Sequence, residues 1–487
     1  MTTQAPHGSR HEARPPGATA ALALPGAATL LGLMNYTAPI ATLTDTADGL
    51  HAGTTARIWV MSSISLGLAA ALLVVGALAD DHGRRRVFAL GGALLALSSI
   101  GCALAPNSAA FVAGRIVQGV ATAALLATGL GIIGHTFTGH ARARAAGIWG
   151  AMLGLGIALG PIAAAWLTQL VDWRLWYWVT VVASLALTAA SRALPESRAE
   201  LRRGLDIPGL ITMVGGVSAL LSAVTLGRTG WTRPTVLALL AAAIVLLIAF
   251  VAVEARRTSP MLDLGLFRRP AFLLSIGGAL VTGLAVIGLM SNLVTIMVSA
   301  LRLSPLAASF VLGIWSGLSY VAALQARRLP ARWPSGVLLG AGLALSAVGE
   351  LAMLGLSPGT SWTRLIPGLV IAGVGSGLAN AMLARLAVDS VPPQRAGMGS
   401  GANNTARYTG AALGVAMVFA INTSSGTTPH AVTHGLNLSL IVSAILCAAG
   451  ALAAIPLSRR AANSATPTTS TSITSTSAGT TPAPAAR

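Results

Sequence analysis

The chain has 487 residues, of which 54% are hydrophobic and only 9% are charged. Its mean hydropathy of +0.75 is higher than soluble globular proteins reach, so the sequence excludes a soluble domain and predicts an integral membrane protein. A net charge of +18 would favour nucleic-acid binding in a soluble protein. In a membrane protein the placement of that charge matters more than its size, and no nucleic-acid partner is expected.

Fourteen low-charge segments follow one another along the chain. Each is long enough to cross a hydrocarbon core of about 30 Å as a helix, and this length excludes the short alternating strands of a membrane barrel. The sequence therefore predicts an all-α membrane protein with about 14 transmembrane helices and both termini on one side. The expected spans are residues 19–43, 57–79, 87–105, 108–135, 144–169, 175–193, 207–227, 234–254, 271–300, 305–325, 335–356, 363–388, 397–421 and 432–456.

The distribution of arginine predicts the orientation of these spans. All 31 basic residues are arginine, and 23 of them fall on the side of the termini against 6 on the other, with Arg115 and Arg407 inside spans. Because positively charged loops stay in the cytoplasm, both termini are expected there, facing anionic lipid head groups as partners. Cys102 and Cys447 both fall in apolar spans, so neither a disulfide nor a metal site is expected.

Two basic connections divide the predicted helices into six, two and six. Two six-helix halves are typical of transporters built from repeats, with a binding site near the middle of the membrane between them. The last residues have little to bury, so a disordered tail is expected. The predicted segments are a cytoplasmic N-terminal tail (1–18), an N-terminal six-helix half (19–193), a cytoplasmic linker (194–206), two additional helices (207–254), a second linker (255–270), a C-terminal six-helix half (271–457) and a Ser/Thr/Pro/Ala-rich tail (458–487).

The connection between the second and third spans carries a concentration of charge. The stretch GALADDHGRRR, Gly76–Arg86, combines two acids, a histidine and three arginines. A carboxylate there can pair with arginines or with the positive end of a helix dipole. The alternative is a tight turn whose arginines only orient the protein. The candidate residues are Gly76, Asp80, Gly83, Arg84 and Arg85.

The fourth span contains RIVQGVATAA, in which Arg115 lies well inside the apolar segment. An arginine at that depth costs several kcal/mol unless it faces water or a partner, which makes Arg115 a functional candidate together with Gln118. The alternative is a structural arginine that bonds backbone carbonyls of a neighbouring helix.

The fifth span contains GAMLGLGIALGPIAAAW. Glycines on one helix face allow a neighbouring helix to approach closely, and proline removes a backbone donor and bends the helix. Small residues at this spacing are common in membrane helices, but a Gly-Pro pair in register with them is more specific. The candidate residues are Gly150, Gly154, Gly156, Gly160 and Pro161.

Three further segments carry distinctive patterns: DWRLWYWV (172–179), PMLDLGLFRRPAF (260–272) and GMGSGANNTARYTGAALG (397–414). Together with the charged loop, Arg115–Gly119 and the Gly-Pro pair of the fifth span, they resemble the major facilitator superfamily in its fourteen-helix drug:proton antiporter branch. The resemblance covers nearly all of residues 19–457. It implies the major facilitator fold, with two six-helix halves plus two extra central helices.

The resemblance also implies roles for two of these motifs. The loop at Asp80 is implied to be a cytoplasmic conformational latch, whose carboxylate caps and charge-pairs with a neighbouring helix end in one conformation and releases it in the other. The bend at Pro161 is implied to pack against the other half and to close one side of a cavity, as in exporters of the superfamily.

The chain departs from the family pattern at several positions. Asp81 stands where a base is usual, which is expected to weaken or rewire the latch. Ala164 and Ala165 replace a glycine pair, and Tyr408 stands in the place of a glutamine. Asn35 occupies the position of the usual first-helix acid, and an asparagine cannot carry a proton at neutral pH.

Proton coupling is expected, because no segment resembles a nucleotide-binding domain. Coupling requires a titratable group inside the membrane, and Glu350 is the only acid deep in a span. The helix order of the family places this span at the periphery of the second half, where Glu350 can instead pair with a neighbour. Asp45, Arg115 and His135 are the further candidates.

The sequence thus predicts a secondary active transporter that exports a hydrophobic or amphipathic small molecule, such as a drug, an antibiotic or a secondary metabolite, in exchange for protons. The alternatives are an uptake symporter on the same fold and a transport-deficient membrane sensor or scaffold. No enzyme motif is found, and no cofactor or metal is expected. A monomer in a bacterial plasma membrane is expected. The residues predicted to line the substrate cavity or to couple transport are Asn35, Tyr36, Arg115, Gln118, Glu350, Asn380, Asn404 and Arg407.

Overall fold

The computed structural model describes residues 17–198, 206–257, 260–330, 333–426 and 428–465, and this part of the chain is helical without any β-strand. What we call the N-terminal half holds α1 (Ala18–Thr37), α2 (Pro39–Gly49), α3 (Thr54–His82), α4 (Arg84–Ala103), α5 (Ser108–Thr136), α6 (Gly139–Leu170) and α7 (Arg174–Ala190). A hairpin of α8 (Ile207–Gly227) and α9 (Pro234–Arg256) follows. What we call the C-terminal half holds α10 (Pro270–Val281), the π-helical segment η3 (Thr282–Ile287), α11 (Gly288–Ala300), α12 (Pro305–Ala326), α13 (Ser335–Ala352), α14 (Ile366–Asp389), α15 (Ala396–Ser425) and α16 (Pro429–Ala465).

Helices occupy all fourteen segments in which spans were expected. In the described chain, twelve helical stretches are long and apolar enough to cross a membrane. The two expected spans missing from this set are α7 and α15. α7 has only 17 residues, and α15 carries a polar run that includes Asn403, Asn404 and Arg407. The structure therefore shows a multi-pass helical protein with twelve candidate spans, two fewer than the fourteen expected.

Proline and capping side chains set several helix boundaries. Pro39 has no N–H to donate, so the first expected span is divided into α1 and α2. Asn107 caps α5, because its side-chain oxygen accepts from Ala110 N at 2.9 Å. Asp206 caps α8 in the same way, accepting from Gly209 N at 3.1 Å. Short polar caps thus begin helices whose own composition is almost entirely apolar.

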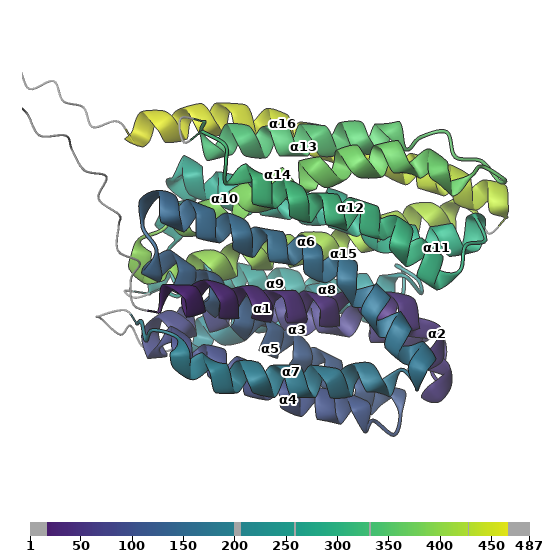
Figure 1. Ribbon diagram of the computed structural model, residues 1–487, viewed down its shortest axis with the longest axis horizontal. Coiled ribbons are helices and arrows are strands. Elements are labelled where there is room, and N and C mark those ends of the chain that lie inside the picture. Colours follow the sequence, from purple (N-terminus) through teal and green to yellow (C-terminus); the bar gives the residue numbers. More distant parts are fainter. Residues whose placement is uncertain (1–16, 199–205, 258–259, 331–332, 427, 466–487) are drawn as a thin grey trace, which may run out of the picture.

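The helices run along the long axis of the molecule, and Figure 1 shows the start of α1 and the end of α16 at the same end. Two seams join the halves: α3 packs along α15, and α6 packs along α12 and α14. The hairpin covers the first seam, because α8 contacts both α3 and α15. The space between the seams is where both halves can contribute to one site.

Several expected segments fall partly outside the described residues. These are the N-terminal tail through residue 16, residues 199–205 of the first linker, residues 258–259 of the second and residues 466–487 of the C-terminal tail. The helix α16 continues to Ala465, so residues 458–465, which were expected to belong to a disordered tail, are helical.

Candidate functional site

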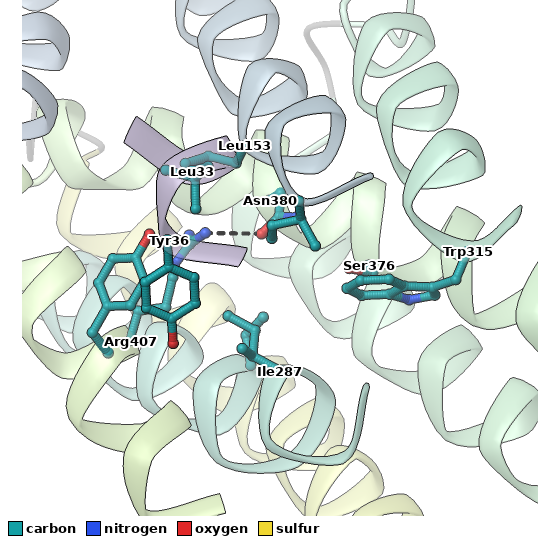
Figure 2. Close-up of a pocket in the computed structure, with 11 residues that line it drawn as sticks. Leu33, Tyr36, Leu153, Ile287, Trp315, Ser376, Asn380 and Arg407 are labelled. Carbon is teal, nitrogen blue, oxygen red and sulfur yellow. Dashed lines mark hydrogen bonds between the residues drawn. The ribbon is translucent and has the colours of Figure 1, made fainter. Parts of the chain in front are cut away.

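A narrow cavity lies between the two halves, where α1 and α6 face η3, α12, α14 and α15 (Figure 2). Its volume is ≈ 20 Å³, which is room for about one water molecule. The structure is therefore closed around the cavity, which is too small for a drug-sized molecule. The lining residues are Leu33, Tyr36, Leu153, Ile157, Thr282, Ile287, Trp315, Ser376, Asn380, Arg407 and Tyr408.

Arg407 on α15 is the charged residue of this lining, and it is only 2% exposed. Its Nη1 donates to Asn380 Oδ1 on α14 at 3.0 Å, as Figure 2 shows. Its Nε and Nη2 have no partner among the described residues, and neither has the Trp315 indole nitrogen. The buried polar atoms of this lining that have no partner among the described residues are therefore all hydrogen-bond donors.

Two tyrosines connect the halves beside Arg407. The rings of Tyr36 on α1 and Tyr408 on α15 are 5.7 Å apart and tilted by 57°. Ser65 Oγ on α3 donates to the Tyr36 hydroxyl at 3.2 Å. A second space of ≈ 20 Å³ adjoins the first through Tyr36 and Trp315 and continues along α11. Aromatic faces thus form much of the wall that a bound molecule would contact.

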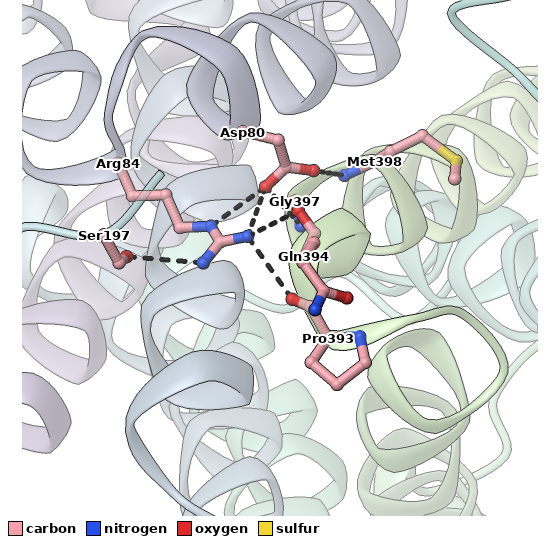
Figure 3. Close-up of polar contacts among 7 residues, drawn as sticks. All are labelled: Asp80, Arg84, Ser197, Pro393, Gln394, Gly397 and Met398. Atoms are coloured by element: carbon pink, nitrogen blue, oxygen red, sulfur yellow. Dashed lines mark hydrogen bonds and ion pairs between the residues drawn. The ribbon is translucent and has the colours of Figure 1, made fainter. Parts of the chain in front are cut away.

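At one end of the seam between α3 and α15, Asp80 and Arg84 join the halves (Figure 3). Arg84 Nε donates to Asp80 Oδ1 at 2.9 Å, and Arg84 Nη2 donates to the Gln394 carbonyl at 3.0 Å. The Asp80 carboxylate accepts from Gly397 N at 3.1 Å and from Met398 N at 2.9 Å. Asp80 therefore caps α15 from across the seam while it pairs with Arg84, and both side chains are buried. We call this set of contacts the latch.

Glycine makes the close approach at the latch possible. A Cβ added to Gly397 would lie 2.6 Å from Asp80 Oδ1 and 2.7 Å from the Gly76 carbonyl oxygen. Gly83 ends α3 with a φ of 109°, which favours glycine over other residues. Arg85 lies outside the buried contacts, because its half-exposed guanidinium pairs with Glu196 at 3.4 Å.

A second ion pair connects the halves close to the latch. Arg142 Nη2, in the first turn of α6, lies 3.0 Å from Asp389 Oδ1 at the end of α14. Arg385 Nε also lies 3.3 Å from this carboxylate. Polar contacts therefore hold this end of both seams, whereas the cavity between the seams is mostly apolar.

Arg115 does not line the cavity. Its Nη1 donates to the Asn35 carbonyl at 2.8 Å and to Gln118 Oε1 at 3.0 Å. Gln118 Nε2 donates to Ser99 Oγ at 2.9 Å, and Trp176 Nε1 donates to Asn35 Oδ1 at 3.1 Å. This buried network joins α1, α4, α5 and α7 inside the N-terminal half. The sequence analysis expected Asn35, Arg115 and Gln118 at the cavity, whereas this network lies inside the N-terminal half.

Residues 26–415 match the sequence profile of the Major Facilitator Superfamily. The chain belongs to this superfamily. The puromycin resistance protein pur8 of Streptomyces alboniger is 33% identical over 430 residues, which cover 84% of each chain. The multidrug resistance protein Stp of Mycobacterium tuberculosis is 32% identical over 378 residues, covering 76% of this chain and 70% of that protein. The human organic anion transporter MFSD10 matches with a TM-score of 0.68 at 16% identity, covering 90% of this chain and 100% of that chain, which shows a shared fold.

In this member of the superfamily the glycines of α6 face three neighbouring helices, α14, α12 and α1. A Cβ on Gly150 would meet the Asn380 carbonyl of α14 at 3.1 Å, and one on Gly154 would meet Ser319 Oγ of α12 at 3.2 Å. A Cβ on Gly156 would meet Leu33 Cβ of α1 at 2.6 Å, and Gly160 also lies against α1. Pro161 follows inside the continuous helix α6. The motif therefore lets one helix pack tightly against α1 and the opposite half at once.

Two other predicted residues lie away from the cavity lining. Glu350 is fully buried between α13 and α16, where its Oε1 lies 4.0 Å from Cys447 Sγ and its Oε2 has no partner. Asn404 Nδ2 donates to the Ser400 carbonyl one turn earlier on α15 at 3.0 Å. Of the eight residues expected at the cavity or in coupling, the structure places Tyr36, Asn380 and Arg407 in the lining.

Most of the remaining lining was missed by sequence reasoning. Leu33, Leu153, Ile157 and Ile287 look like any lipid-facing residue in an apolar span. Trp315 carried a usable signal, because a tryptophan in the middle of a span needs a partner for its N–H and is unusual away from the membrane surface.

Proposed function

We propose that this protein exports hydrophobic or amphipathic small molecules by alternating access. The observation that carries this is a cavity built by both halves, which the latch joins at one end of their seam. The latch contacts are polar, so water can replace them when the halves separate. Opening at that end would expose the cavity to one side of the membrane, and opening at the opposite end would expose it to the other side.

Export, rather than uptake, is supported by two observations. The relatives pur8 and Stp carry names that refer to puromycin resistance and multidrug resistance. Gly150 and Gly154 of α6 pack against α14 and α12 of the opposite half, which fits part of the exporter-type motif that contains Pro161. The protein acts as a transporter and not as an enzyme on this proposal, with fourteen spanning helices that include α7 and α15. It works as a monomer in a bacterial plasma membrane, with cytoplasmic termini whose arginines contact anionic lipids.

Coupling to protons is assigned to Glu350 through Ser443. Ser443 on α16 lies beside Glu350, but in this structure its hydroxyl donates to the Ala285 carbonyl of η3 at 3.0 Å and forms no hydrogen bond with the Glu350 carboxylate. A hydroxyl has a single proton to donate, so it can serve only one of these acceptors at a time. Ionised Glu350 would accept a hydrogen bond from the Ser443 hydroxyl, which breaks the hydrogen bond from Ser443 to Ala285 of η3. Neutral Glu350 would let Ser443 donate to Ala285 again. Thr282 and Ile287 of η3 line the cavity. Protonation of Glu350, away from the cavity, would therefore act on the cavity wall through Ser443 and η3.

Everted membrane vesicles test the proposal. We expect vesicles that contain the protein to accumulate at least one of puromycin, rhodamine 6G and fluorescein when a proton gradient is imposed, and to stop when it is dissipated. Glu350→Gln should abolish this dependence, while Glu196→Gln, a change at a partly exposed acid, should leave it intact. Accumulation by right-side-out vesicles alone would establish uptake instead of export. Transport that ignores the gradient, or a Glu350→Gln variant that behaves as wild type, would refute the coupling.

A further inference from the structure

The unsatisfied polar atoms of the cavity share one property. Among the described residues that line it, the buried polar atoms without a partner are Arg407 Nε, Arg407 Nη2 and Trp315 Nε1. All three are donors and none is an acceptor. A buried donor without an acceptor is costly, so a ligand that offers acceptors removes that cost on binding.

The two free nitrogens of Arg407 lie on the same edge of its guanidinium. Nε–H and one Nη2–H point in parallel, and a carboxylate or sulfonate accepts both in a bidentate pair. Asn380 occupies only Nη1. The Nε and Nη2 edge of the guanidinium, which suits an oxyanion, is therefore the edge that has no partner in the protein.

No acid balances this charge. None of the described residues that line the cavity is Asp or Glu. Arg407 forms none of the ion pairs found in the described chain, and neither do the buried Arg115 and the partly buried Arg228. Arg228 lies just beyond α8, and its guanidinium is 5.5 Å from the centre of the Phe419 ring. Desolvation by partial burial lowers the pKa of the Arg228 guanidinium. Both Arg115 and Arg228 act electrostatically on Tyr36 in the lining, so the surroundings of the cavity are positive.

A cationic molecule finds no corresponding partner. Asn35 is neutral, and its side-chain oxygen already accepts from Trp176 inside the N-terminal half. Glu350 lies between α13 and α16, outside the lining. The aromatic walls at Tyr36, Tyr408 and Trp315 stack on a flat apolar skeleton, and the gain of about 0.5 to 2 kcal/mol for a cation over a ring face is opposed by repulsion from the buried, uncompensated charge of Arg407.

We propose that the cavity selects amphipathic aromatic anions, whose carboxylate, sulfonate or phenolate oxygens bind the Nε and Nη2 edge of Arg407. This substrate class rests on the proposed export function for its physiological meaning. The binding preference itself is a property of the cavity and can be measured without transport.

Fluorescein and rhodamine 6G separate the classes, because they share a xanthene skeleton and carry opposite charges. Equilibrium dialysis with purified full-length protein in detergent, corrected for dye bound by empty micelles, gives the two dissociation constants. We expect fluorescein to bind more tightly by about tenfold or more. Arg407→Gln should remove that preference, whereas Arg256→Gln, at an exposed arginine that ends α9, should retain it.

Asn380→Asp is the second variant and keeps the side-chain shape. It places a carboxylate where an amide now contacts Arg407 at 3.0 Å, so the arginine is neutralised inside the folded cavity. Fluorescein binding should weaken by about tenfold or more, and rhodamine 6G binding should not weaken. A wild-type protein that prefers rhodamine 6G, that binds no fluorescein, or whose anion preference survives both variants overturns the proposal. Anion binding by a protein whose vesicles accumulate none of puromycin, rhodamine 6G and fluorescein would uphold the selectivity and refute export.

Discussion

The latch and the cavity both place a buried arginine between the two halves, but they treat it differently. In the latch, Arg84 meets the Asp80 carboxylate and the Gln394 carbonyl, and the same carboxylate caps α15. In the cavity, Arg407 meets one neutral oxygen, on Asn380, and keeps two nitrogens free.

This difference assigns different roles to the two arginines: Arg84 holds the two halves together, and Arg407 binds a ligand. A buried charge that is fully bonded stabilises one arrangement of the helices and is strongly destabilising when its partner is removed. A buried charge that is left open costs the resting structure stability, and it gains most when a ligand with acceptors binds. The latch should therefore control stability and conformation, and the cavity should control which molecule is bound.

The largest effect is expected from Asp80→Ala. This change leaves Arg84 buried without its counterion and removes the cap of α15, so the closed state should lose about 3 kcal/mol or more. Thermal unfolding in detergent together with vesicle transport would measure it. The matched control is Asp48→Ala, because Asp48 pairs with Arg57 while 65% of the Asp48 side chain is exposed. The free energy of unfolding of this control should fall by less than about 1 kcal/mol. Equal losses for the two variants would contradict the assigned role of the latch.

A smaller effect is expected from Gly397→Ala. Its Cβ would crowd Asp80 Oδ1 at 2.6 Å, and relieving that contact should cost about 1 to 3 kcal/mol of the closed state. Gly101→Ala is the control, since nothing lies within 4 Å of the Cβ position there. Thermal unfolding of the two variants should differ in this direction, and an unaffected Gly397→Ala protein would mean that the seam adapts to the extra methyl group.

Arg407→Gln should change stability by less than about 1 kcal/mol, because it removes one hydrogen bond and also an unpaired buried charge. Arg84→Gln should lower the free energy of unfolding by clearly more than Arg407→Gln does. Unfolding midpoints of the two variants, measured side by side, test the contrast between the regions directly. A larger loss for Arg407→Gln would show that this arginine is structural.

The smallest effect is expected from Asp81→Arg. The carboxylate that caps α15 belongs to Asp80, and Asp81 lies half-buried on the last turn of α3. Restoring the base usual in the family should therefore change transport rates by less than about twofold. A large gain in rate would show that the departure at Asp81 weakens the latch.

The positions of the helices could be predicted from the sequence, because uninterrupted apolar segments have few alternatives in a membrane. In the structure Asp80 accepts hydrogen bonds from the first turn of α15, and its release in another conformation stays a prediction. The partners from distant segments, such as Gln394 and Met398, could not be predicted, since no local pattern specifies which helix end meets α3.

The direction in which each helix face points is the main feature of the site that could not be predicted from the sequence. In apolar spans a polar residue is conspicuous, but the sequence does not show whether it faces the other half or its own half. Arg115 and Arg407 looked equivalent for this reason. Tertiary contacts place Arg115 among Asn35 and Gln118 inside one half and Arg407 in the shared cavity.

Reversible cross-linking of the latch end tests alternating access most directly. Cysteines at positions 142 and 389, where Arg142 and Asp389 now pair at 3.0 Å across the halves, can be joined by 1,2-ethanediyl bismethanethiosulfonate and released by dithiothreitol. Each single-cysteine variant controls for the buried Cys102 and Cys447. Transport should stop on cross-linking and return on reduction in the double variant alone. Undiminished transport by fully cross-linked protein would contradict opening at this end of the molecule.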